Sequence, residues 1–308
     1  MFMHKSYVRK AFRKSLSIQL IILFLSIGLM FSASAQKVDE IISSYTGANA
    51  KGFLQPLANT LTSTFNTGQA HKTSIDDGLH VYIGAVAFTT FVFDDKLKYF
   101  TGTTDRNFSP EQSAQVSTIV GPSKAVSVNG TNGTSYTFPA GLGLKYFTVA
   151  VPQLTIGNIF GTELTGRFIA IDLGGDFGKL SLLGGGLRHD LGQYFIPSDS
   201  KFIISAEYAY QQFKAGNYVS LTTHKAGIYA GQQGKIFNYF AYAGYQNGAM
   251  NIRYNDSVDA SPVNIDLTNK NPLLLGIGAG AKLWILRLHL QASFISPVVV
   301  AGGLGLSF

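Results

Sequence analysis

Alternation of apolar and polar residues with a period of two constrains this chain more than any other feature. In KLWILRLHLQASF, one face carries Trp284, Leu286, Leu288, Leu290, Ala292 and Phe294, and the other carries Arg287, His289, Gln291 and Ser293. The pattern recurs in KFIISAEYAYQQF, where Glu207 falls on the polar face, and in PLLLGIGAGAK. A period of two is that of a β-strand. Segments of about ten residues with one apolar face are typical of a transmembrane β-barrel, in which lipid-facing and lumen-facing residues alternate.

A soluble β-sandwich is the alternative, because it shows similar alternation. Two features count against it: the unbroken apolar runs on one face, and an export signal. Residues 1–35 hold five basic residues and no acid, then LIILFLSIGLMF, then Ala33-Ser34-Ala35. This order predicts a signal peptide cleaved before Gln36. The apolar run is shorter than the roughly 20 residues of a membrane helix.

Charge and cysteine content exclude several classes of protein. Without residues 1–35, 19 of the 24 basic residues remain against 17 acidic ones, so the exported chain is nearly neutral. Near-neutrality gives no support for nucleic-acid binding. The chain has no cysteine, which excludes disulfides and thiolate metal sites.

Residues 36–78 have helical rather than strand periodicity. Val38, Ile41, Ile42 and Tyr45 form one apolar face, and Leu54, Leu57, Leu61 and Phe65 form another. The sequence therefore predicts two short amphipathic helices, separated at Asn49–Gly52, with Pro56 in the first turn of the second. We expect this segment to plug a barrel formed by residues 79–308.

Parity sets the predicted strand number. Eleven strands are recognisable, near 298–308, 285–295, 272–282, 248–255, 235–247, 218–231, 201–213, 177–189, 163–173, 144–157 and 79–93. Bacterial barrels have an even number of strands. We therefore predict an all-β, antiparallel up-and-down barrel of about 12 strands (10–14), with the missing one near 135–144. The strand at 144–157 is then the third and runs outward, and the loops near 94–133, 189–200 and 255–271 all lie outside.

The last strand carries Leu304, Leu306 and Phe308 on one face, and nothing follows Phe308. A barrel closes by pairing its last strand with its first, which leaves no edge. A C-terminal aromatic residue on such a strand resembles the recognition signal of bacterial outer-membrane barrels. The resemblance implies that the barrel assembly machinery is a partner.

Enzymatic chemistry finds little support. No phosphate-binding loop, G-x-S-x-G motif or metal-ligand spacing of histidines occurs. We predict no enzyme, no cofactor and no metal site. Arg188, His189 and Asp190 are expected at a solvated strand end, and Glu207, Arg287, His289 and Gln291 inside the lumen. Pro152 deletes a ladder hydrogen bond, which indicates either a bulge or a gap in the wall.

The segments VDEIISSYTGANAKGFLQPLANTL, GTELTGRF and LGGGLRHDLGQY resemble an uncharacterised family of Gram-negative outer-membrane barrels, a domain of unknown function. The layout is distantly similar to the FadL family of hydrophobic-compound transporters. That similarity implies a hatch inside a barrel and a sideways opening, here near Pro152. The expected function is passive uptake of small hydrophobic molecules across the outer membrane. The expected partners are outer-membrane lipid and a hydrophobic or detergent-like ligand in the lumen. The alternative is a structural or assembly-partner barrel without transport.

Overall fold

The computed structural model describes residues 47–72, 74–75, 78–105, 107–172, 174, 178–255, 262–295 and 297–308. All of them belong to one compact unit, Glu40–Phe308. The predicted signal peptide and the predicted helix over residues 38–45 lie outside the described residues.

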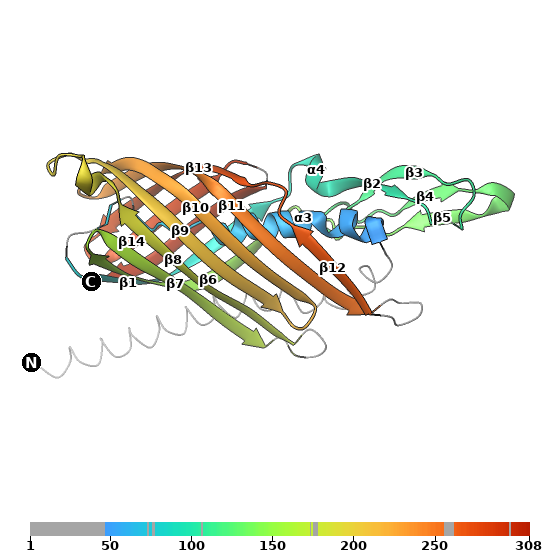
Figure 1. Cartoon of the computed structure of the whole chain (residues 1–308), viewed down its shortest axis with the longest axis horizontal. Coiled ribbons are helices and arrows are strands. Elements are labelled where there is room, and N and C mark those ends of the chain that lie inside the picture. Colours follow the sequence, from blue (N-terminus) through green and yellow to red (C-terminus); the bar gives the residue numbers. More distant parts are fainter. Residues whose placement is uncertain are drawn as a thin grey trace, which may run out of the picture. The chain divides into compact units, whose positions relative to one another are not determined.

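Ten antiparallel strands form a closed ring (Figure 1). They are β1 (His80–Phe91), β6 (Tyr146–Ile159), β7 (Thr162–Asp172), β8 (Lys179–Asp190), β9 (Phe202–Ala215), β10 (Val219–Gln233), β11 (Phe237–Asn255), β13 (Leu273–Leu283), β14 (Leu286–Ser293) and β15 (Val298–Ser307). The ring closes where β15 pairs with β1, with Tyr82 opposite Ser307. Closure satisfies the backbone of both edge strands, as a bilayer requires.

The predicted count of about 12 strands is therefore not what the described residues show. The segments at 235–247 and 248–255 are one strand, β11. An Asn-Gly pair such as Asn247-Gly248 favours a tight turn, but here it lies within the strand. Gly248 leaves room for α3, because a Cβ there would meet the Thr62 hydroxyl at 2.0 Å. A further short strand, β12 (Pro262–Thr268), pairs with residues 249–255 of β11. It lies on the same edge of β11 as β13, which pairs with residues 237–245.

The segment at 135–144 is not a barrel strand either. β1 pairs directly with β6, so residues 92–145 form an insertion, here called the extension. The extension contains α4 (Asp95–Lys98), β2 (Tyr99–Thr103), β3 (Ser113–Ser117), β4 (Val126–Asn129), the 3-10 turn η1 (Thr131–Gly133) and β5 (Ser135–Phe138). Its strands pair as two hairpins, β2–β3 and β4–β5.

The two ends of the barrel differ. We call the end where β1 begins and β15 finishes the terminal end, and the opposite one the far end. The extension joins β1 to β6 at the far end, where β11 also finishes, whereas residues 191–201, which include η3 (Gly192–Tyr194), connect β8 to β9 at the terminal end. Part of the predicted loop near 255–271 lies outside the described residues. The prediction that 189–200 lies on the same side as the other long loops is wrong. Because two predicted strands form the single strand β11, the strands from β6 to β10 run opposite to their predicted directions. β6 is the second strand of the barrel and runs toward the terminal end.

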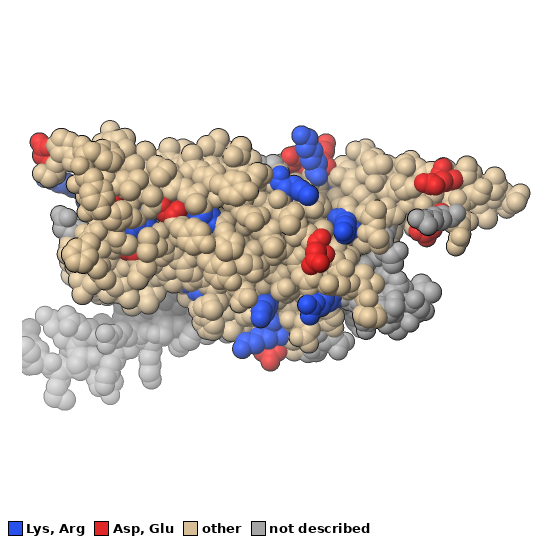
Figure 2. All heavy atoms as spheres, viewed as in Figure 1, with Lys and Arg blue, Asp and Glu red and all other residues tan. Residues whose placement is uncertain are grey.

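The outer wall is apolar over a limited height. Outward residues include the terminal Leu304, Leu306 and Phe308, which are 49%, 41% and 65% exposed. Farther toward the far end lie Tyr208, Tyr210 and His224, where the Tyr208 hydroxyl lies 2.7 Å from His224 Nδ1. Beyond them β11 presents Arg253, and the charged side chains on the visible face gather mostly toward this end (Figure 2). An apolar band bounded by aromatic residues is the surface a bilayer covers.

No helix among the described residues is long and apolar enough to cross a membrane.

One helix, α3 (Gly47–Asn66), lies inside the far half of the ring. It includes Asn49–Gly52, which the sequence predicted as a break, and Pro56 stands in its interior rather than its first turn. Phe53 and Leu54 of α3 join a core that continues through Phe213 and Ile252 of the wall into the extension. Burial of this apolar face outweighs the missing proline hydrogen bond.

The far end and the terminal end should differ in access from outside. We expect Asn132→Cys in the extension to react with an impermeant thiol reagent on intact cells, and Ser198→Cys to react only after permeabilisation. The chain has no native cysteine, so each label reports one position. Equal labelling of both positions on intact cells would contradict the ten-strand topology.

Phe308 allows the backbone and side-chain roles of the terminus to be separated. Its N–H donates to the Val81 carbonyl at 2.9 Å, and its carbonyl accepts from the Val81 N–H at 3.0 Å. Deleting Phe308 removes both closing bonds and the exposed ring, whereas Phe308→Ala removes only the ring. If the ring is an assembly signal, both variants should accumulate unassembled, as measured by heat-modifiable gel mobility. Normal assembly of Phe308→Ala would limit the role of the terminus to closure.

Candidate functional site: the plug and the lumen wall

The described residues between 47 and 78 run through the barrel, and we call them the plug. Of the predicted apolar face, Leu54 and Phe65 are buried, while Leu57 and Leu61 are half-buried against the same core. Phe65 lies 5.1 Å from Phe213 of β9, between ring centroids. The lumen of the far half is therefore apolar and occupied by α3.

Threonines lie on both flanks of this apolar face of α3 and are also buried. Thr60, Thr62 and Thr64 each donate a hydroxyl bond of 2.7 Å to the carbonyl four residues earlier. A threonine that bonds its own helix needs no outside partner. The Thr64 hydroxyl also lies 2.5 Å from that of Thr90 on β1. The helix thus contacts a polar part of the wall without leaving buried hydroxyls unpaired.

After Asn66 the plug continues as coil through the terminal half, where Arg167 of β7 contacts its backbone. The Arg167 guanidinium donates to the carbonyls of Phe65 and Thr67 at 3.2 Å each, and to that of Gly68. Its Nε donates to Gln153 Oε1 at 2.9 Å. One buried arginine therefore satisfies three carbonyls that have no helix or strand partner.

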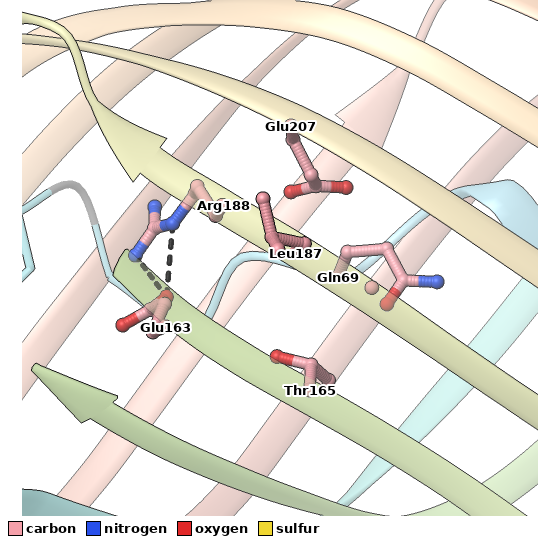
Figure 3. Close-up of a pocket in the computed structure, with 7 residues that line it drawn as sticks. Gln69, Glu163, Thr165, Leu187, Arg188 and Glu207 are labelled. Carbon is pink, nitrogen blue, oxygen red and sulfur yellow. Dashed lines mark hydrogen bonds and ion pairs between the residues drawn. The ribbon is translucent and has the colours of Figure 1, made fainter. Parts of the chain in front are cut away.

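Arg188 of β8 repeats this arrangement one strand away. It donates to the carbonyls of Lys72 and Ser74 at 2.6 and 3.4 Å, and forms two bonds to Glu163 Oε1 at 2.9 and 2.5 Å (Figure 3). The other Glu163 oxygen lies 3.8 Å from Lys72 Nζ and 3.5 Å from His80 Nε2. Glu163 thus lies between Arg188 of the wall and Lys72 of the plug in a buried cluster of charges.

The predicted lumen-facing residues all lie on the inner face. Glu207 forms an ion pair of 2.5 Å with Lys225. Arg287, His289 and Gln291 of β14 are buried on the same face. The His289 ring lies over Gly303 of β15, where a Cβ would meet it at 2.0 Å. The inner glycines therefore accommodate side chains of neighbouring strands, besides the helix at Gly248.

The buried lumen carries an excess of positive charge. Among the described residues it holds five cations (Lys72, Arg167, Arg188, Lys225 and Arg287) against two carboxylates (Glu163 and Glu207). His71 of the plug stacks on Tyr82, with ring centroids 4.2 Å apart. Burial lowers the pKa of His71 well below its usual value, and Lys72 and Arg188 act in the same direction against Glu163. His71 is therefore neutral and adds no positive charge to the lumen.

A small pocket lies between plug and wall, lined by Gln69, Glu163, Thr165, Gly186, Leu187, Arg188 and Glu207 (Figure 3). The buried amide of Gln69 has no hydrogen-bond partner among the described residues. The pocket is too narrow for an organic solute. The described residues of plug and wall therefore pack closely around this pocket.

The wall itself is interrupted between β6 and β7. The ladder pairs Gln153 with Arg167 and extends only toward the terminal end. Toward the far end, Tyr146–Pro152 of β6 and Phe168–Asp172 of β7 are not paired with each other, and we call this the ladder break. It begins at Pro152, which has no N–H to donate. Val151 and the half-buried Val149 and Ile169 line its inner side as part of the apolar core.

Sequence reasoning missed the central residues of the plug contact. It placed Arg188 at a solvated edge, but Arg188 is only 3% exposed. His189 does face outward, with Nδ1 2.7 Å from the Thr162 hydroxyl. The alternation along each strand could have revealed the inward position of Arg188. Glu163, Thr165 and Arg167 alternate with outward residues on one strand, as Gly184, Gly186 and Arg188 do on the next.

No group of three or more His, Cys, Asp or Glu side chains within the described ranges could hold a metal ion.

The chain belongs to the family of unknown function DUF6588, whose model matches residues 13–308. No curated protein matches it. Among solved structures, it is similar to the N-terminal β-barrel domain of Pseudomonas aeruginosa OprF, with 19% identity over 48% of this chain and 94% of that one, and a TM-score of 0.23. It is also similar to the β domain of the Bordetella autotransporter BrkA (12% identity, 74% and 100%, TM-score 0.31). A third is the Pseudomonas putida toluene transporter TodX (10% identity, 87% and 94%, TM-score 0.25).

The buried cluster predicts a specific pattern of stability. Arg188→Leu leaves Glu163 and two plug carbonyls without their donor, and should cost about 3–5 kcal/mol of unfolding free energy. Arg188→Leu combined with Glu163→Leu should cost less, because no carboxylate stays buried without its strand partner. Urea unfolding in detergent micelles measures both.

Arg253→Leu is the matched control, because Arg253 lies exposed on β11. We expect it to change the unfolding free energy by no more than about 0.5 kcal/mol. If Arg188→Leu behaved like Arg253→Leu, the plug would not depend on the cluster.

Proposed function

We propose that this protein is an outer-membrane barrel that passes small hydrophobic molecules sideways, from the far half of its lumen through the ladder break into the membrane. The observation that carries the proposal is the coincidence of two features at Pro152: the wall pairing stops there, and the interior behind it is apolar. An apolar solute could leave through such an opening without crossing a polar surface.

The closed terminal half supports a lateral rather than an axial route. Arg167, Arg188 and the plug coil fill that half with hydrogen-bonded polar groups. A hydrophobic solute would lose its apolar surroundings there, and the buried polar groups would lose their partners. The ladder break instead lies beside the far half, where the apolar core reaches the wall.

The half-buried side chains of α3 are the groups that a solute would displace first. Leu57 and Leu61 pack against the core without being fully enclosed. Leu61→Ala opens space at the helix surface, and the ring of strands does not depend on that side chain. We therefore expect Leu61→Ala to change the rate of uptake while the barrel remains folded.

The alternative is a structural barrel whose extension binds another envelope protein. The extension projects beyond the apolar band and carries exposed polar side chains, including Thr101, Gln115 and Asn132. Such a role needs no passage through the wall. Closing the ladder break therefore separates the two functions.

A double-cysteine variant closes the break. Continuing the register of Gln153 and Arg167 by three positions places Ala150 opposite Ala170. We expect a short bis-maleimide linking Ala150→Cys to Ala170→Cys to lower the uptake of a fluorescent long-chain fatty acid into liposomes toward that of empty liposomes. Pro152→Val should lower it less, by adding one N–H to the wall.

The matched control links Gly166→Cys to Gly185→Cys, which lie opposite each other in the intact β7–β8 ladder. Its uptake should equal that of the unlinked protein, and glucose flux should stay low throughout. Unchanged fatty-acid uptake in the Ala150–Ala170 cross-linked protein would exclude the ladder break as the route. No uptake by the wild type would favour the structural barrel.

A further inference from the structure

Two neighbouring turns at the terminal end carry large, exposed apolar side chains. Trp284 is the first residue of the turn between β13 and β14 and is 86% exposed. Ile236 is the last residue of the turn between β10 and β11 and is also exposed. The Lys282 N–H donates to the Ile236 carbonyl at 2.8 Å, so the two turns lie side by side. Such side chains in adjacent turns indicate a surface that something outside the barrel covers.

The backbone of Trp284 also indicates an external partner for the indole ring. Its φ is 59°, in the left-handed region that favours glycine or asparagine. A bulky side chain in that region costs free energy. Because so little of the ring is buried, packing on the barrel returns almost none of that cost. The indole therefore contributes to something other than the fold of its own turn.

Lysines accompany these apolar side chains. Lys235 lies in the first turn and Lys282 just before the second, and both are exposed. Residues 233–237 and 281–286 contain no acidic residue. Within the described ranges neither lysine forms an ion pair. A third lysine, Lys201, lies on the other side of the first turn, where its carbonyl is bonded to the end of β10. This sector of the rim is therefore positively charged.

The apolar outer wall continues up to the two turns. Phe237, next to Ile236, and Leu283, next to Trp284, are both exposed on the outer face. The turns thus lie at the edge of the surface that a bilayer covers, at the depth of the lipid headgroups. Tryptophan suits that depth because it joins an apolar ring to a polar N–H, and lysine because its charged end reaches water. A lipid covers wall and turns together, whereas a soluble protein would cover only the turns.

The terminal end has the short turns that are typical of the periplasmic side of a bacterial barrel. Residues 160–161, 234–236 and 284–285 join β6 to β7, β10 to β11 and β13 to β14. The membrane leaflet on that side consists of phospholipids, and some of these carry a net negative headgroup. Basic side chains beside apolar ones are suited to such headgroups.

We propose that Lys235, Ile236, Lys282 and Trp284 form a binding site for the headgroup of an anionic phospholipid, here called the rim site. The two lysines contact the phosphate, and the two apolar side chains lie against the upper part of the acyl chains. The site is separate from the ladder break, because β14, β15 and β1 lie between β13 and β6, and β10, β9 and β8 lie between β11 and β7. Lipid bound there anchors the barrel and takes no part in passage.

Trp284 is the only tryptophan of the chain, so its fluorescence reports on the rim site directly. The purified full chain is reconstituted in phosphatidylcholine vesicles with a minor fraction of phosphatidylglycerol or phosphatidylcholine whose brominated acyl chains quench indoles on contact. We expect several-fold stronger quenching by the brominated phosphatidylglycerol, since each lysine near an anionic surface favours binding by about five-fold. Equal quenching by both lipids would overturn the proposal. No quenching by either would place the indole outside the bilayer and favour a protein partner instead.

Lys235→Gln combined with Lys282→Gln tests the lysines. This double variant should lose the preference for phosphatidylglycerol, while heat-modifiable gel mobility shows that the barrel stays folded. The matched control is Lys179→Gln combined with Lys214→Gln, which removes two exposed lysines from the far end and should keep the preference. A preference that survives the first change, or is lost equally in the second, would show a general attraction of the barrel for anionic lipid and reject the rim site.

A second control moves the probe to another turn. Phe160, between β6 and β7, is also exposed at a positive φ of 51°, but residues 157–163 contain no lysine. Phe160→Trp combined with Trp284→Phe should therefore be quenched equally by the two brominated lipids. A preference for phosphatidylglycerol at this position as strong as that at Trp284 would contradict a site made by the two lysines.

Discussion

Hydrogen bonding of the plug backbone is the constraint on which the rest of the structure depends. A coil inside a barrel has no helix or ladder partners, and each unpaired carbonyl away from water costs free energy. Arg167 and Arg188 meet this need, since each planar guanidinium donates to several carbonyls at once. Glu163 partly balances the charge that the two arginines bring into the lumen. The wall and the plug therefore form a single hydrogen-bonded unit.

The lumen divides into two halves with different chemistry. In the part of the chain that the structure describes, the terminal half is lined by buried polar groups, and the far half is apolar and contains α3. This division follows from where the plug is helical. A helix satisfies its own backbone and can bury leucine and phenylalanine, whereas the coil needs polar partners. The ladder break at Pro152 opens beside the apolar half, which is why a lateral route for hydrophobic molecules fits this barrel better than an axial pore. The same threading brings the start of α3 to the far end, beside the extension.

Much of the wall could be predicted from the sequence, because its faces meet different surroundings. Alternation placed Leu288 and Leu304 outside and His289 inside, where the structure has them. The boundaries of the strands were harder to predict from the sequence. Asn247-Gly248 resembles a turn, yet Gly248 is required by its contact with Thr62, which no local pattern reveals. SYTF (135–138) has strand character but pairs with Val126–Asn129 in the extension rather than with a barrel strand. Arg188 resembled a solvated residue because its partners, Glu163 and the plug carbonyls, lie far away in sequence.

The central claim is that the plug seals the barrel against axial flow, so that any passage is lateral. Ionic current through the purified protein in planar lipid bilayers tests it most directly. A lumen closed by the Arg167 and Arg188 contacts predicts no steady open-channel current under moderate voltage, from protein that still takes up a hydrophobic probe in liposomes. A stable, ohmic conductance from the folded wild-type protein would show an open water path along the axis and would contradict the account.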